Sequence, residues 1–113
     1  MSVELVQIDR QGVCVIALKG RLDSANVGEV EKGLSRLFAG PGEKAVVDME
    51  RLDYISSAGL RLMLMLAKRA QHTGGRFMLS SLAPSVREVF EISGFLKILD
   101  TKPNTDAALD SIG

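Results

Sequence analysis

The residues best placed to carry chemistry in this chain are two adjacent serines, Ser56 and Ser57, set between two apolar runs. Residues 45–47 read as a buried strand, and the apolar periodicity of residues 60–70 reads as a helix. The first N–H groups of a helix have no partner within it, and they favour negative charge together with the helix dipole. This turn could therefore hold a phosphate, and we expect Ser57 to be a reversible phosphorylation switch on a partner-binding surface.

A plainer interpretation is that both serines only cap and start the helix. Ser56 is the better candidate for the N-cap itself, which leaves the hydroxyl of Ser57 without a capping role. Gly59 is unusual under this interpretation, because glycine in a helix costs about 1 kcal/mol relative to alanine. Ala58 and Gly59 also keep the turn free of bulky side chains, so that a protein could approach Ser57.

Composition limits the class of protein. The chain has 113 residues, 46% of them hydrophobic, which suits one globular domain spanning residues 1–113. Lysine plus arginine and aspartate plus glutamate number 14 each, so the broad positive field of a nucleic-acid-binding protein is missing. The first residues lack a basic n-region, and the apolar run from Leu60 is too short to cross a bilayer. Cys14 is the only cysteine, so no disulfide can form within the chain, which fits a reducing compartment. Together these features predict a cytoplasmic protein with no membrane partner.

Strands and helices are predicted to alternate along the chain. A hairpin about Gly12 comes first, and a capping box of Asn26 and Glu29 marks the start of the first helix. Alternation implies parallel strand pairing after the hairpin, in an α/β fold with a mixed sheet and helices packed mainly on one face. The predicted strands cover 3–8, 13–18, 44–48, 76–79 and 96–99, and the predicted helices run from 23–26 to about 38, 56–72, 84–93 and 105–112, the last capped by Asn104 or Thr105.

Other reactive residues offer little chemistry. Asp23, Asp48 and Asp53 could form an acidic site, but we expect Asp23 to cap a helix and Asp53 to belong to a turn, with no bound metal. His72 is the only histidine and is expected at the surface, so there is no material for a nucleophile–base pair. Cys14 lies in an apolar strand and should be a small core residue. We expect no catalytic residues and no cofactor.

Four segments resemble one known family. Residues 54–60, Tyr-Ile-Ser-Ser-Ala-Gly-Leu, resemble the signature of STAS domains, specifically of bacterial anti-sigma factor antagonists. Residues 20–23 resemble the family's turn after the second strand, residues 46–49 its central strand, and residues 93–98 its segment after the third helix. The resemblance covers essentially the whole chain in order, and it implies a STAS-like fold with an N-terminal antiparallel hairpin and a parallel core.

The resemblance also implies a function in partner switching. Members bind an anti-sigma factor, a serine-protein kinase of the histidine-kinase-like ATPase type, and so release the sigma factor. The kinase phosphorylates a serine at the start of the second helix, which ends the interaction, and a serine phosphatase restores it. The family's phosphoacceptor position falls on Ser57. Many members have aspartate where this chain has Ser56, and serine or threonine where it has Ala58, so Ser56 stays an alternative acceptor.

By this resemblance the chain is expected to be a non-enzymatic monomer that forms a heterocomplex. The docking surface should surround Ser57 and include Asp23, Ser24, Ser56, Ala58, Gly59 and Arg61. One alternative is a STAS module of another partner-switching or transport complex, serving secretion, biofilm formation or lipid transport. A second alternative, from another class, is a small nucleotide-binding enzyme.

Overall fold

A computed structural model describes residues 3–112, which form one five-stranded sheet in the order β1-β2-β3-β4-β5. β1 (Val3–Arg10) and β2 (Val13–Leu22) form the antiparallel hairpin at one edge. Gln11 and Gly12 join them with positive φ angles of 59° and 81°, as in the tight turns that suit the twist of a hairpin. The limits of the predicted domain, residues 1 and 113, lie outside the described residues.

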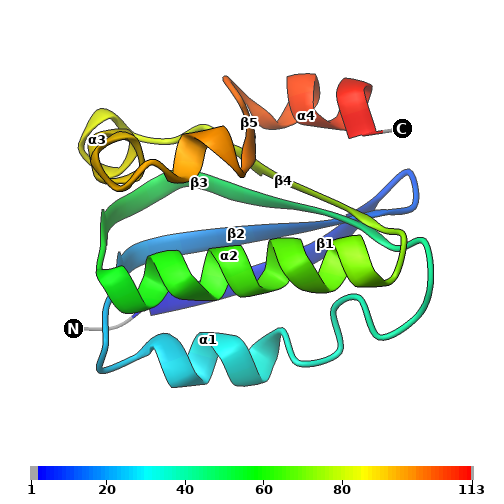
Figure 1. Ribbon diagram of the computed structural model, residues 1–113, viewed down its shortest axis with the longest axis horizontal. Helices are drawn as coiled ribbons and strands as arrows, with labels where there is room; N and C mark the ends of the chain where they lie inside the picture. The colour runs from blue at the N-terminus through cyan, green and yellow to red at the C-terminus, as the bar shows by residue number, and fades with distance from the viewer. Residues whose placement is uncertain (1–2, 113) are drawn as a thin grey trace.

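The remaining strands are parallel to β2. They are β3 (Lys44–Ile55), β4 (Arg76–Ser80) and β5 (Asp100–Lys102). The connections contain α1 (Val27–Gly33), α2 (Ser57–His72), and α3 (Pro84–Ser93) with the short 3₁₀ helix η1 (Phe95–Lys97) (Figure 1). α4 (Thr105–Ile112) follows β5. The predicted α/β fold, with a mixed sheet and an N-terminal antiparallel hairpin, is confirmed.

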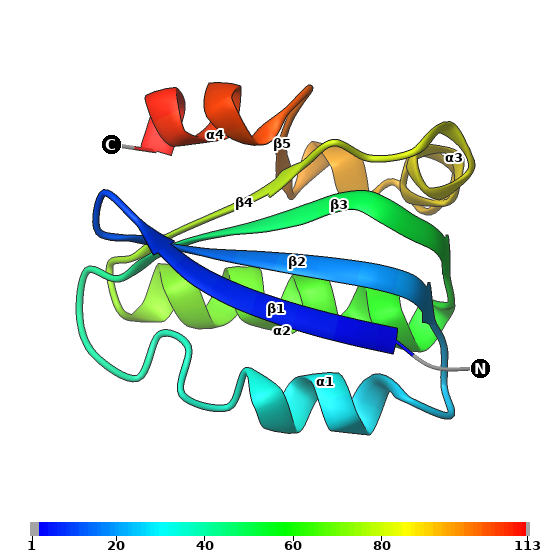
Figure 2. The ribbon, with the colours of Figure 1, turned by 180° about the vertical axis from the view of Figure 1, so that it is seen from behind.

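Two cores of unequal size lie on opposite faces of the sheet. Because side chains alternate along a strand, Val47 enters the larger core while its neighbour Val46 enters the smaller one. The larger core lies against α1 and α2, and Val86 and Phe90 of α3 join it. The smaller core packs under α4, on the other side of the sheet from α2 in both views (Figures 1 and 2).

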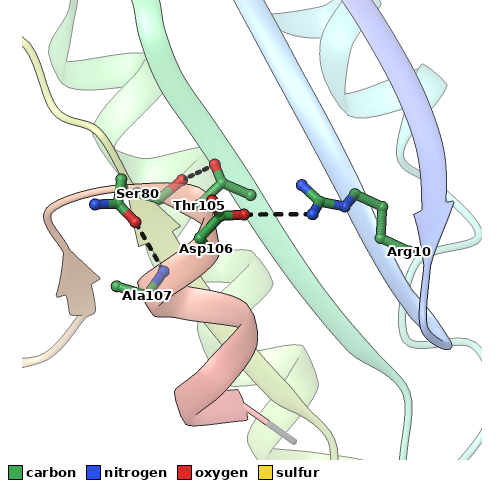
Figure 3. A network of polar contacts seen from close by, with 6 residues as sticks. Arg10, Ser80, Thr105, Asp106 and Ala107 are labelled. Carbon is green, nitrogen blue, oxygen red and sulfur yellow. Dashed lines mark hydrogen bonds and ion pairs between the residues drawn. The ribbon is translucent and has the colours of Figure 1, made fainter.

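Polar contacts fix α4 to the sheet (Figure 3). The buried hydroxyl of Ser80 lies 2.8 Å from that of Thr105, and Arg10 on β1 forms a 3.3 Å ion pair with Asp106. The side-chain oxygen of Asn104 accepts a 2.8 Å hydrogen bond from the Ala107 N–H, so the predicted cap at Asn104 is confirmed. Within residues 3–112, no helix is long and apolar enough to cross a membrane.

The predicted end of the second strand at residue 18 was wrong, since β2 continues through Gly20 to Leu22. Three further boundaries were wrong. Asp53 was expected in a turn, but it lies in β3, which continues to Ile55. The irregularities between Ala17 and Lys19 and between Gly20 and Arg21 let β2 stay paired with this longer strand. The predicted last strand at 96–99 is instead η1 and a turn. The last strand, β5, begins just after this segment, at Asp100, which pairs with Met78 on β4.

The third correction concerns α1, which ends at Gly33 and not near residue 38. Tight turns follow it, with Leu37 N–H donating to the Leu34 carbonyl at 3.0 Å. Phe38, with a positive φ of 64°, is buried with its ring edge-on to Phe77. The apolar residues Leu34, Leu37 and Phe38 are therefore buried as predicted, but they lie in turns and not in the helix.

Candidate functional site

The serine turn joins the end of β3 to the start of α2. Ser56 is the N-cap, with φ −89° and ψ 174°, and its hydroxyl oxygen accepts a 3.3 Å hydrogen bond from the Gly59 N–H. Ser57 is the first helical residue and is exposed. Within residues 3–112, no group hydrogen-bonds the Ser57 hydroxyl. Ser56 thus performs the capping, and the oxygen of Ser57 is open to another protein.

The end of β2 lies beside this turn. The Ser56 N–H donates a 2.9 Å hydrogen bond to the Leu22 carbonyl, and Leu22 is the ladder partner of Ile55. Since Asp23 and Ser24 follow Leu22 directly, they lie next to the serine turn, at the end of the molecule where α1 and α2 both begin (Figure 1).

A buried asparagine holds the turn after β2 in shape. The Asn26 side chain donates to the Arg21 carbonyl at 2.8 Å and accepts from the Asp23 N–H at 2.9 Å. The Asp23 carboxylate accepts hydrogen bonds from the N–H groups of Ala25 and Asn26 at 3.0 and 3.1 Å, so it closes the turn before α1 and is not the expected helix cap. The predicted capping box with Glu29 does not form, because the Asn26 side chain is used against β2. Sequence reasoning missed this role of Asn26.

Gly59 is explained by packing inside the chain. It is buried, and a Cβ atom at this position would lie 2.7 Å from Ile55 Cγ1 and 3.0 Å from Leu22 Cγ and Cδ2. Only glycine lets the first turn of α2 approach the ends of β2 and β3 this closely. Among the expected docking residues, Ser24, Ser57 and Arg61 are exposed, and Asp23, Ser56 and Ala58 are half-buried; Gly59 does not reach the surface.

Arg21 and Tyr54 contact each other near the ends of β2 and β3, close to the serine turn. The guanidinium of Arg21 lies 4.1 Å from the ring centroid of Tyr54, in the geometry of a cation–π contact, and Tyr54 is 38% exposed. The two residues are ladder partners on neighbouring strands. Only the strand register reveals this pairing, so no signal along the sequence could have found it.

The other candidate groups lie apart from this site. His72 is exposed at the end of α2, and Asp48 accepts a 3.0 Å hydrogen bond from the Glu50 N–H. Cys14 is half-buried on β2, where burial and, to a lesser degree, the carboxylates of Asp9 and Glu43 raise the pKa of its thiol. The described part of the chain contains no group of three or more His, Cys, Asp or Glu side chains that could hold a metal ion.

Known proteins identify the family to which this chain belongs. A family model for the STAS domain matches residues 4–108. The chain therefore belongs to the STAS domain family, and within it to the anti-sigma factor antagonist type. BtrV of Bordetella bronchiseptica, classed as an anti-sigma factor antagonist, is 42% identical over 108 residues, which are 96% of this chain and 91% of BtrV. Antagonists of this type are regulators and not enzymes, which fits the expectation from the sequence.

Solved structures share the fold. An anti-sigma factor antagonist from Mycobacterium paratuberculosis superposes with a TM-score of 0.87 at 22% identity, covering 98% of this chain and 94% of that one. The Bacillus cell fate determinant SpoIIAA in its phosphorylated form gives a TM-score of 0.69 at 23% identity, covering 99% of this chain and 100% of that one.

Proposed function

We propose that this protein binds an anti-sigma factor and so frees a sigma factor, and that phosphorylation of Ser57 ends the binding. The partner is a serine kinase of the histidine-kinase-like ATPase type, and a serine phosphatase reverses the modification. The observation that carries the proposal is the exposed Ser57 hydroxyl at the first position of α2, beside the turn of Asp23 and Ser24. The name of BtrV and the phosphorylated form of SpoIIAA support it by analogy.

The site can accept a phosphate without unfolding. A phosphoserine carries about −1.5 to −2 charges at pH 7, and the free N–H groups and dipole of a helix N-terminus favour such a charge. Ser56 already caps α2, so modification of Ser57 does not remove the cap. The switch therefore acts on docking rather than on the fold.

The phosphate would weaken binding of the partner protein. A partner that covers Ser57 would have to remove water from a dianion, at a cost of several kcal/mol unless a cation meets it. Since about 1.4 kcal/mol is a tenfold change in affinity, this cost is enough to break a micromolar complex. The Asp23 carboxylate lies beside the turn and would repel the new charge locally.

The geometry favours Ser57 over Ser56 as acceptor. Ser56 is half-buried, and its hydroxyl oxygen is used in a hydrogen bond with Gly59, whereas Ser57 is exposed. A kinase would reach Ser57 without disturbing the helix start. Ser56 would have to rotate out of its capping position first.

Mass spectrometry after incubation with the candidate kinase and ATP tests this proposal. Trypsin cleaves after Arg51 and Arg61, so one peptide, residues 52–61, contains both serines. We expect one phosphate, placed on Ser57 by the fragment ions that separate the two serines. The Ser57→Ala variant should stay unmodified and Ser56→Ala should still be modified; phosphate on Ser56 alone, or on neither serine, would contradict the proposal.

A further inference from the structure

A groove opens between α1 and α2, directly beside the serine turn. It has a volume of about 250 Å³, and Ala58, the residue after Ser57, forms one end of its wall. Helical spacing brings its lining residues together, four apart on α1 and three or four apart on α2. They are Val27, Glu31, Ala58, Arg61, Leu62 and Met65.

The groove has an apolar floor and one charge on each side. Leu62 is buried, and Val27, Ala58 and Met65 are half-buried. Glu31 on α1 and Arg61 on α2 are exposed, and in the part of the chain that the structure describes neither side chain forms an ion pair or a hydrogen bond. Two opposite charges without internal partners therefore flank an apolar slot.

We infer that this groove receives an amphipathic helix of the kinase partner. That helix places a large apolar side chain on the floor, an acidic side chain against Arg61 and a basic side chain against Glu31. Charge complementarity fixes the direction of the docked helix, and the flexible Met65 adapts the floor to the inserted side chain. Insertion of one helix into an apolar groove is a common mode of recognition. This inference rests on the proposed function, since it names the surface that the same partner uses.

The groove also links docking to the switch. Ser57 and Arg61 are four residues apart on α2, so their side chains are neighbours on the helix surface. A phosphate on Ser57 would attract the Arg61 guanidinium by a charge-assisted hydrogen bond. The arginine that meets the partner's acidic residue would then be occupied by the phosphate. Phosphorylation thus removes a docking contact besides adding charge.

Calorimetric titration with the purified serine kinase that phosphorylates this chain tests the inference. Arg61→Glu and Glu31→Lys should each weaken binding about tenfold or more, because each puts like charges together in the complex. Met65→Glu should do the same by placing a carboxylate on the apolar floor. Lys68→Glu is the matched control: it makes the same charge change as Arg61→Glu on the same helix but outside the groove, and it should stay within about twofold of wild type.

The outcomes separate the two proposals. If wild type binds and phosphorylation of Ser57 weakens that binding, but Arg61→Glu and Glu31→Lys bind as Lys68→Glu does, the groove is not the docking surface and the switch still stands. If wild type does not bind, the proposed function fails and the inference fails with it. Thermal melting followed by circular dichroism checks that each variant is folded. Both charge variants are at exposed positions, so they test the groove even if Met65→Glu does not fold.

Discussion

The backbone N–H of Ser56 donates a 2.9 Å hydrogen bond to the carbonyl of Leu22, which ties the serine turn to the end of β2. Two segments that are far apart in the sequence therefore form one surface, with Ser57 on one side and Asp23 and Ser24 on the other. The position of the switch depends on the strand ladder as well as on α2. Substitutions in this frame should alter stability in ways that the helix alone would not predict.

Gly59→Ala tests the close contact beneath the serine turn. In an ordinary helix this change would raise stability by about 1 kcal/mol. Here the new methyl group would overlap Ile55 and Leu22, so we expect the free energy of unfolding to fall by about 1–3 kcal/mol. Urea unfolding gives the value. Gly28→Ala on α1, where a Cβ atom meets nothing within 4 Å, is the control and should be neutral or stabilising; a stabilised Gly59→Ala would contradict the packing.

Asn26→Ala tests the clamp on the turn after β2. The change leaves the Arg21 carbonyl and the Asp23 N–H without their partners, so we expect a loss of about 1–3 kcal/mol in the free energy of unfolding. Asn26→Asp retains the acceptor but cannot donate to Arg21, and it should not restore stability. Ser24→Ala, at an exposed neighbouring position, should change little. Equal unfolding curves for Asn26→Ala and wild type would show that water replaces the clamp.

Cys14 gives a prediction on pH. Burial, with Asp9 and Glu43 as smaller causes, raises the pKa of its thiol in the folded protein. Because the folded state holds the proton more tightly, the resulting stability is present below the ordinary pKa and is lost as the pH rises through the raised value. The rate of alkylation by iodoacetamide should therefore reach its midpoint at a higher pH in the native protein than in urea. Coincident midpoints would show that the native environment does not hold the proton, and Cys14→Ala is the blank.

Much of the fold follows from local patterns. Apolar runs bounded by glycine and proline placed the turn of the hairpin, α2 and α3 correctly, because those segments form the same structure that their local sequence favours. The boundaries that failed depend on contacts elsewhere in the chain. β3 extends to Ile55 where β2 remains paired with it, and the residues after Gly33 form turns that end with Phe38 buried in the core.

In the candidate site, too, only the features that depend on local sequence could be predicted. Ser56 as cap and Ser57 as exposed hydroxyl could be predicted from a strand-to-helix turn alone. The roles of Asn26 and Gly59 and the Arg21–Tyr54 contact could not, since each depends on which residues the sheet brings together. The interpretation of Gly59 as room for an approaching protein is replaced by packing against Ile55 and Leu22.

Variants at the switch residue test its charge. Ser57→Asp adds one negative charge at an exposed position and should weaken kinase binding several-fold, because an aspartate carries less charge than a phosphate. Ser57→Ala removes only the hydroxyl and should bind as wild type does while resisting modification. Both should unfold at temperatures close to that of wild type. Equal affinities for Ser57→Asp and wild type would argue strongly against an electrostatic switch.

The most direct measurement compares the affinity of the purified serine kinase for the unmodified protein and for protein phosphorylated only on Ser57. We expect at least about a tenfold loss of affinity on phosphorylation, recovered after treatment with a serine phosphatase. Unchanged affinity for a sample that mass spectrometry shows to be fully phosphorylated on Ser57 would contradict the account.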